Sequence, residues 1–86
     1  MITTGRYASK ETRVFAKSLA KTINTYYASR GKKTIDILAK QARKNGETRI
    51  CIIFEKNKKP CRLNFIEIKE NSSWFWLQEE IEINET

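Results

Sequence analysis

The sequence has no histidine, three glycines and two cysteines, and each shortage excludes a class of function. Without histidine, the chain lacks the side chain that most often transfers protons near neutral pH. Its glycines form neither a Gly-x-Gly-x-x-Gly pattern nor the phosphate-binding loop of nucleotide hydrolases. Two cysteines are too few for a four-ligand zinc site. We therefore expect a protein that is not an enzyme and that holds no metal and no cofactor.

Long apolar runs are also missing. The longest is Ile50–Phe54, far below the roughly 18 residues that cross a bilayer, and no signal-peptide core follows Met1. These features predict a cytoplasmic protein without membrane contact. Cys51 is expected to be a buried apolar residue. A hairpin would let Cys51 and Cys61 reach each other, but a reducing compartment favours free thiols.

Positive charge is abundant and unevenly distributed. The 86 residues carry a net charge of +7, but residues 1–49 alone carry +9 and residues 50–86 carry −2. A separate basic half is typical of proteins that bind nucleic acids, because it can neutralise phosphates. We therefore expect a nucleic acid as the main partner, and a merely solvated basic surface is the less favoured explanation.

Two amphipathic helices are predicted. The first follows the N-cap Ser9 and runs to about Ile23, with apolar residues at spacings of three and four. The second runs from about Thr34 to Lys44 and ends at Asn45-Gly46. The polar face of the first helix is almost purely basic, which favours an anionic partner. This face consists of Lys10, Arg13, Lys17 and Lys21.

Five strands complete the pattern, and Thr48–Phe54 is expected at the centre, because its apolar run indicates burial on both faces. The β-α-β-α-β-β-β order, with right-handed crossovers, predicts a single small α/β domain. Its mixed five-stranded sheet has the order 2-1-3-4-5, with one helix on each face. The last three residues are expected to fray. The predicted strands are 1–4, 24–29, 48–54, 62–69 and 74–83.

Two basic turns join a strand to a helix in this arrangement, at residues 3–10 and 26–34. The sheet order places both at one edge, where ligands of open α/β sheets bind. Cationic side chains and free backbone N–H groups at helix N-termini are suited to phosphates. The predicted RNA-binding residues are Arg6, Lys10, Arg13, Arg30, Gly31, Lys32 and Lys33.

Aromatic residues add the option of stacking on unpaired bases. Tyr7, Tyr26 and Tyr27 lie near the turns, and strand alternation leaves at most one of Tyr26 and Tyr27 outside the core. Trp74 and Trp76 are expected in the core or in a protein interface, because the acidic residues that follow them would repel a phosphate backbone.

Residues 2–20 resemble the start of a Brix domain, where an Ile-Thr-Thr-Ser-Arg-like strand is followed by a Ser, an Arg two to five residues on, and a Phe-x-x-x-Leu helix. The string Arg30-Gly31-Lys32 is similar to that family's Asn-Arg-Gly-Lys segment and is the more specific match. Gly5 departs from the pattern, which commonly has Ser there. The resemblance is closest to short archaeal members and covers only the first half of a usual Brix domain. We therefore expect residues 1–86 to form a half-size Brix-like domain.

The resemblance implies a fold like the anticodon-binding domain of class II aminoacyl-tRNA synthetases and a non-catalytic role in ribosome biogenesis. Its implied partners are ribosomal RNA or its precursor and ribosome assembly proteins. A homodimer through the last strand is one way in which two such halves can combine. Two alternatives stay open. One is a duplex nucleic-acid binder similar to the archaeal Alba proteins, and the other is a protein-interaction module that docks through its C-terminal aromatic strand.

Overall fold

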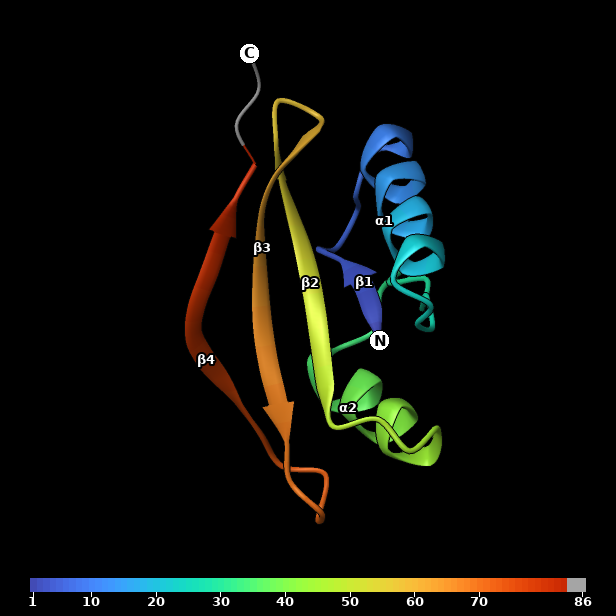
Figure 1. The fold of residues 1–86 in the computed structure, drawn as a ribbon, viewed down its shortest axis with the longest axis vertical. Helices are drawn as coiled ribbons and strands as arrows, with labels where there is room; N and C mark the ends of the chain where they lie inside the picture. Colours follow the sequence, from blue (N-terminus) through green and yellow to red (C-terminus); the bar gives the residue numbers. More distant parts are fainter. Residues whose placement is uncertain (84–86) are drawn as a thin grey trace.

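The computed structural model describes residues 1–83 as two helices and a four-stranded mixed sheet (Figure 1). The strands lie in the order β1-β2-β3-β4, with β1 parallel to β2 and the other pairs antiparallel. No helix in this part of the chain is long and apolar enough to span a membrane. The expected fraying concerns residues 84–86, which lie outside the described residues. The elements are β1 (Ile2–Thr4), α1 (Lys10–Thr22), α2 (Ile35–Lys44), β2 (Arg49–Lys56), β3 (Lys59–Ile68) and β4 (Trp74–Glu82).

Both helices begin at the predicted hydroxyl caps. The Ser9 side chain accepts a hydrogen bond from the backbone N–H of Thr12 at 3.3 Å. The Thr34 side chain likewise accepts one from the N–H of Ile37 at 3.3 Å. Each cap satisfies a backbone donor that has no partner within its helix. The caps therefore fix where each basic turn ends and its helix starts.

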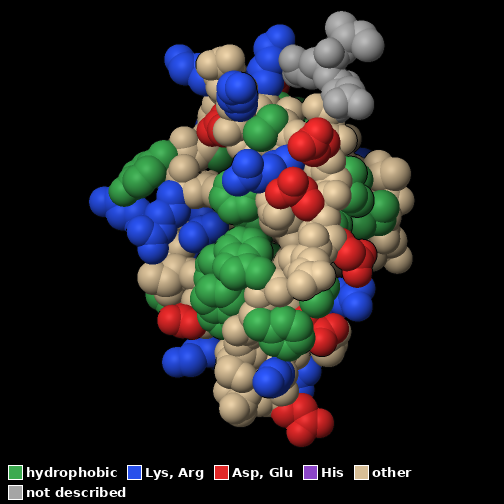
Figure 2. All heavy atoms as spheres, turned by 90° about the vertical axis from the view of Figure 1, so that its left-hand side faces the viewer, with side chains coloured by type: hydrophobic (Ala, Val, Ile, Leu, Met, Phe, Trp, Pro, Cys, Tyr) green, Lys and Arg blue, Asp and Glu red, His purple; other side chains and the backbone are tan. Residues whose placement is uncertain are grey.

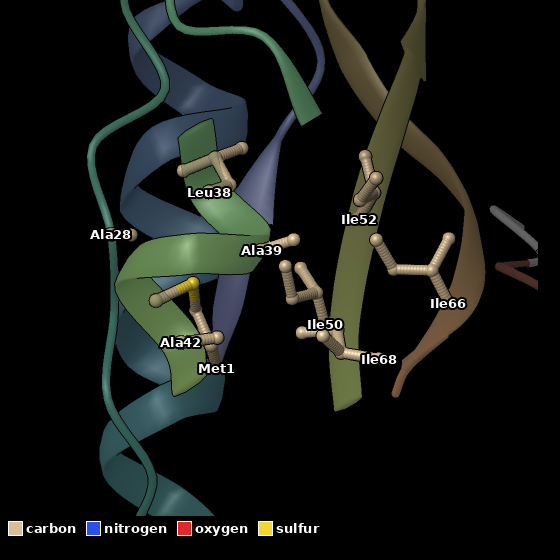
Figure 3. Close-up of a cluster of buried hydrophobic side chains, with 9 residues drawn as sticks. All are labelled: Met1, Ala28, Leu38, Ala39, Ala42, Ile50, Ile52, Ile66 and Ile68. Carbon is tan, nitrogen blue, oxygen red and sulfur yellow. The ribbon is translucent and has the colours of Figure 1, made fainter. Parts of the chain in front are cut away.

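β2 is the centre of the fold, as its apolar run predicted. Ile50 and Ile52 point to one side of the sheet, which α2 covers, and Cys51 and Ile53 point to the other, which α1 covers. We call these sides the α2 face and the α1 face. The prediction of one helix on each face is confirmed. The buried cluster of the α2 face also contains Met1, Ala28, Leu38, Ala39, Ala42, Ile66 and Ile68 (Figure 3).

The predicted strand at residues 24–29 is not a strand, so the prediction of five strands was wrong. Its place beside β1 was right, because Tyr27 forms a single parallel bridge with Ile2. The N–H and C=O of Ile2 are bonded to the residues on either side of Tyr27, at 2.8 and 2.9 Å. The ladder ends there, and the next acceptor along it, the carbonyl of Ala28, accepts a hydrogen bond from the Thr3 hydroxyl at 2.7 Å. β1 is only three residues long and offers little more edge to pair.

β4 forms the far edge of the sheet, away from both helices (Figure 1). Its pairing with β3 is interrupted, because Asn64 pairs with Glu80 but Ile66 pairs with Trp76. The stretch of β4 from Trp76 to Glu80 therefore lies opposite the shorter stretch of β3 from Asn64 to Ile66, and the extra residues of β4 form a bulge. Phe75 and Trp76 are 40% and 45% exposed. β4 thus displays aromatic side chains at the sheet edge, and its first residue, Trp74, contacts the start of α2.

The two thiols are expected to differ in reactivity. Burial raises the pKa of Cys51 to about 11, whereas Cys61 is partly exposed. At about pH 8, only roughly a thousandth of Cys51 is therefore thiolate. A thiol reagent under native conditions should modify Cys61 quickly and Cys51 only on unfolding. The measurement is the time course of labelling, with Cys61→Ser as the control that removes the fast phase. Two fast equivalents per chain would contradict the buried position of Cys51.

Candidate nucleic-acid interface

The two basic turns lie against each other, as the predicted sheet order required. Arg30 connects them, because its Nη1 donates to the carbonyl of Thr4 at 3.0 Å and its Nε donates to the carbonyl of Lys33 at 2.7 Å. Arg30 is 8% exposed. One buried guanidinium therefore holds the end of β1 against the turn that leads into α2.

A cavity of about 270 Å³ opens between the two turns. Four of the predicted site residues line it, namely Arg13, Arg30, Gly31 and Lys32. Gly31 has a φ of +50°, a backbone conformation that glycine adopts at less cost than other residues. The other lining residues are Thr4, Gly5, Tyr7, Ala8 and Ser29.

The positive charge around this cavity has no carboxylate to balance it. Within residues 1–83, no carboxylate forms an ion pair with Arg6, Arg13, Arg30 or Lys32. Burial lowers the pKa of Arg30, and the nearby charge of Arg6 lowers it further. A buried cation without a counter-charge is unfavourable. An anion bound in the cavity would therefore supply the counter-charge that Arg30 lacks among residues 1–83.

The remaining predicted residues lie beside the cavity and do not line it. Arg6 and Lys10 are exposed on the first turn and at the start of α1. The ammonium group of Lys33 folds back and donates to the carbonyl of Ser29 at 3.2 Å. Lys33 thus stabilises the second turn, whereas Arg6 and Lys10 extend the cationic surface around the cavity opening.

The two helix N-termini, which were predicted to act alike, differ in the structure. At α1, the carboxylate of Glu55 accepts hydrogen bonds from the N–H of Ser9 at 2.9 Å and from the hydroxyl of Thr12 at 3.0 Å. Hydrogen bonding by Ser9, assisted by Thr12, lowers the pKa of Glu55 below its ordinary value. A carboxylate of the chain itself therefore occupies the approach to α1, and the cavity between the turns is the better anion site.

Sequence reasoning missed a third basic segment, the turn between β2 and β3. The hydroxyl of Ser9 donates to the carbonyl of Lys58 at 2.8 Å, so this turn lies beside the start of α1. Lys56 and Lys58 are exposed there, close to Lys10 in the fold. The contact joins residues 49 positions apart, and the second half of the chain is acidic in sum. The local sequence therefore did not indicate that this basic turn lies beside the start of α1.

The three tyrosines near the turns have different environments. Tyr7 is 78% exposed and stands at the cavity, in a backbone conformation with a φ of +59°. Tyr26 is 45% exposed, and its hydroxyl accepts a hydrogen bond from Gln41. Tyr27 packs against the buried cluster of the α1 face, with the ammonium of Lys17 5.7 Å from its ring centre. The alternation predicted for Tyr26 and Tyr27 is confirmed.

A larger hollow of about 440 Å³ lies beside the β2–β3 turn, but it shares no lining residue with the cavity between the basic turns. Its lining includes Ile83, the last residue that the structure describes. No group of three or more acidic or cysteine side chains within residues 1–83 is placed to hold a metal ion. The cavity between the turns is the site at which predicted residues, charge and shape coincide.

Comparison with known proteins places this fold among archaeal structures. The chain matches no protein-family model and no curated protein sequence. It is similar to the crystal structure of Mil, an archaeal Imp4-like protein, with 27% identity and a TM-score of 0.70 over 77% of this chain. It is also similar to a probable ribosomal biogenesis protein from Aeropyrum pernix K1, with 30% identity and a TM-score of 0.73 over 77% of this chain. The chain spans 42% and 37% of these two proteins.

The contact between Glu55 and the start of α1 predicts a pH-dependent stability. Because folding lowers the pKa of Glu55, its stabilising effect is present above the ordinary value of 4.5 and is lost as the pH falls through the lower folded-state pKa. Glu55→Gln should therefore cost about 1 kcal/mol of unfolding free energy near pH 7 and little in acid. Thermal unfolding of both proteins at several pH values measures this.

Glu67→Gln is the matched control for this variant. Glu67 lies on β3 and pairs with Arg49 at 3.5 Å, and both side chains are exposed. Such a surface pair contributes little to stability. If Glu55→Gln and Glu67→Gln change stability equally at every pH, the role of Glu55 in anchoring α1 is refuted.

Proposed function

We propose that this chain is a non-catalytic RNA-binding factor of ribosome biogenesis. The resemblance to the Brix family, predicted from the two turns, is confirmed by the solved structures and supports this proposal. Its partners are ribosomal RNA or its precursor and, with them, ribosome assembly proteins in the cytoplasm. Phosphate capture needs no proton transfer, which agrees with the absence of histidine.

The observation that carries this proposal is Arg30. Its guanidinium is 8% exposed, lines the cavity and pairs with no carboxylate among residues 1–83. A protein that needed Arg30 only to connect two turns could have placed an acidic residue beside it. A phosphate in the cavity would supply that counter-charge and would accept charge-assisted hydrogen bonds.

The surrounding cations extend the interface beyond one phosphate. Arg13 and Lys32 line the cavity, and Lys10, Lys56 and Lys58 continue the positive surface toward the β2–β3 turn. Figure 2, a view onto the β4 side, shows Lys and Arg side chains gathered along the top and the left of that face. A surface of this length can neutralise several phosphates, so binding should weaken steeply with salt.

Protein docking through β4 is the second candidate function, and the exposure of this strand supports it. The outer edge of β4 pairs with no strand of the described chain, and Phe75, Trp76 and Ile81 are exposed. Unpaired edges of this kind can pair with another strand. A second copy could use this edge without covering the cavity. Sedimentation of the protein alone, over a range of concentrations, tests this candidate.

Removing the two exposed cations of the cavity tests the main proposal. Arg13→Ala combined with Lys32→Ala should weaken binding to structured RNA about tenfold or more at about 0.1 M salt, because two phosphates lose their partners. The slope of log affinity against log salt should fall by roughly 1.5. Filter-binding titrations at several salt concentrations measure both quantities. Arg30 is unsuited to this test, since its removal would also release the two turns from each other.

The control variant is Lys40→Ala combined with Lys44→Ala, which removes the same charge from exposed positions of α2 away from the cavity. It should leave affinity and salt slope nearly unchanged. Equal losses in the two double variants would mean that only net charge matters, and the cavity would not be the site.

A competition experiment separates the proposal from the alternative of a duplex nucleic-acid binder. Structured RNA should displace the labelled RNA better than duplex DNA does.

A further inference from the structure

Three aromatic side chains form one surface on the part of the α2 face that α2 leaves uncovered. Phe54 comes from β2, and Trp74 and Trp76 come from β4. The ring centres of Phe54 and Trp76 are 6.4 Å apart, and those of Trp74 and Trp76 are 6.0 Å apart with the rings nearly perpendicular. We call these three residues the aromatic platform. In Figure 2, a hydrophobic area occupies the middle of the β4 side, next to the Lys and Arg side chains.

Trp76 is the exposed member of the platform, and its neighbours hold it in place. Phe54 and Trp74 both pack against the buried cluster of the α2 face, and the indole N–H of Trp74 donates to the carboxylate of Asp36 at 2.6 Å. Trp76 rests between them and is 45% exposed. An aromatic ring that its neighbours hold in place and that stays partly exposed is pre-organised for stacking.

The platform is continuous with the cavity through Gly5. Gly5 follows β1 and lines the cavity, and a Cβ atom there would lie 3.4 Å from the ring of Phe54. The ring of Phe54 therefore lies directly beside Gly5, one of the residues that line the cavity. The cavity that Arg30 and Gly5 line is therefore followed by Phe54, beside Gly5, and then by the exposed ring of Trp76.

The charges around the platform permit a nucleic acid despite the acidic second half of β4. Arg62 places its guanidinium 4.9 Å from the ring centre of Phe54 and 3.8 Å from a carboxylate oxygen of Glu80. Asn64 also donates to Glu80, at 3.0 Å. Asp36, the other carboxylate at the platform, is engaged by Trp74. Glu80 and Asp36 are thus partnered, which weakens the repulsion predicted for Trp76.

We propose that unpaired bases of single-stranded RNA stack on the aromatic platform, with Trp76 as the main contact, while their phosphates lie in the cavity between the turns. The proposal rests on the proposed function and adds the form of RNA that the site selects. A phosphate and its base are adjacent in a nucleotide, and so are the cavity and the platform. Base stacking on aromatic side chains tolerates any sequence, so the platform selects unpaired strands over duplexes.

The experiment compares a labelled RNA strand of about twelve nucleotides with the same strand annealed to its complement, by fluorescence anisotropy. Trp76→Ala should weaken binding of the single strand about tenfold and leave duplex binding within about twofold. Trp76→Phe should restore most of the affinity, since a phenyl ring also stacks. The salt slope should not change, because Trp76 lies on no phosphate contact.

Phe75→Ala is the matched control. Phe75 is the neighbouring aromatic residue of β4, is 40% exposed and points to the opposite face. The Phe75→Ala protein should bind the single strand and the duplex with the affinity of the wild type. The stacking proposal would be overturned if Trp76→Ala bound the single strand as tightly as the wild type, or if it lost affinity equally for single strand and duplex. In either case an unchanged salt slope would still support the phosphate site. A wild type that binds no RNA would overturn both proposals.

Sedimentation of wild type and Trp76→Ala without RNA distinguishes a protein interface from a base platform. A concentration-dependent mass that is lost in Trp76→Ala would show that Trp76 faces another protein chain, and would overturn the proposal. The same mass in both proteins agrees with a platform that is open for bases.

Discussion

The buried guanidinium of Arg30 is the contact on which the interface depends. Its two hydrogen bonds end on backbone carbonyls of different turns, so they position main chain and are independent of the side chains nearby. A lysine could not replace it, because one ammonium lacks the two divergent donors of the planar fork. This connection holds together the two turns that line the cavity. The same guanidinium lines the cavity, so one side chain both holds the two turns together and adds positive charge to the proposed site.

The patterns that could be predicted were local or followed from chain connectivity. The caps at Ser9 and Thr34, the central position of β2 and the meeting of the two turns needed only helix periodicity, apolar runs and right-handed crossovers. The second strand was overestimated, since composition could not show that Thr3 would take the next ladder acceptor. The likeness to an anticodon-binding domain stays a prediction.

Long-range side-chain contacts were beyond the reach of the sequence. The carboxylate of Glu55 reaches back to Ser9, which turned a predicted phosphate site at α1 into an internally capped helix. The assignment of Trp76 to a core or protein interface followed from the acidic residues after it. Arg62 and Asn64, which partner Glu80, lie on a different strand and could not be assigned to it in advance. The charge of neighbouring residues in the sequence therefore predicts the surroundings of a side chain less well than the charge of its neighbours on adjacent strands.

The bulge in β4 has a consequence for solubility. An edge strand with exposed aromatic residues is a template on which identical chains can stack, and stacking requires an unbroken row of regularly spaced backbone groups. Between Trp76 and Glu80 this row is broken, because β4 holds more residues than the opposing stretch of β3. The residues that follow carry like charges. Exposed aromatic side chains on β4 can thus coexist with resistance to fibril growth.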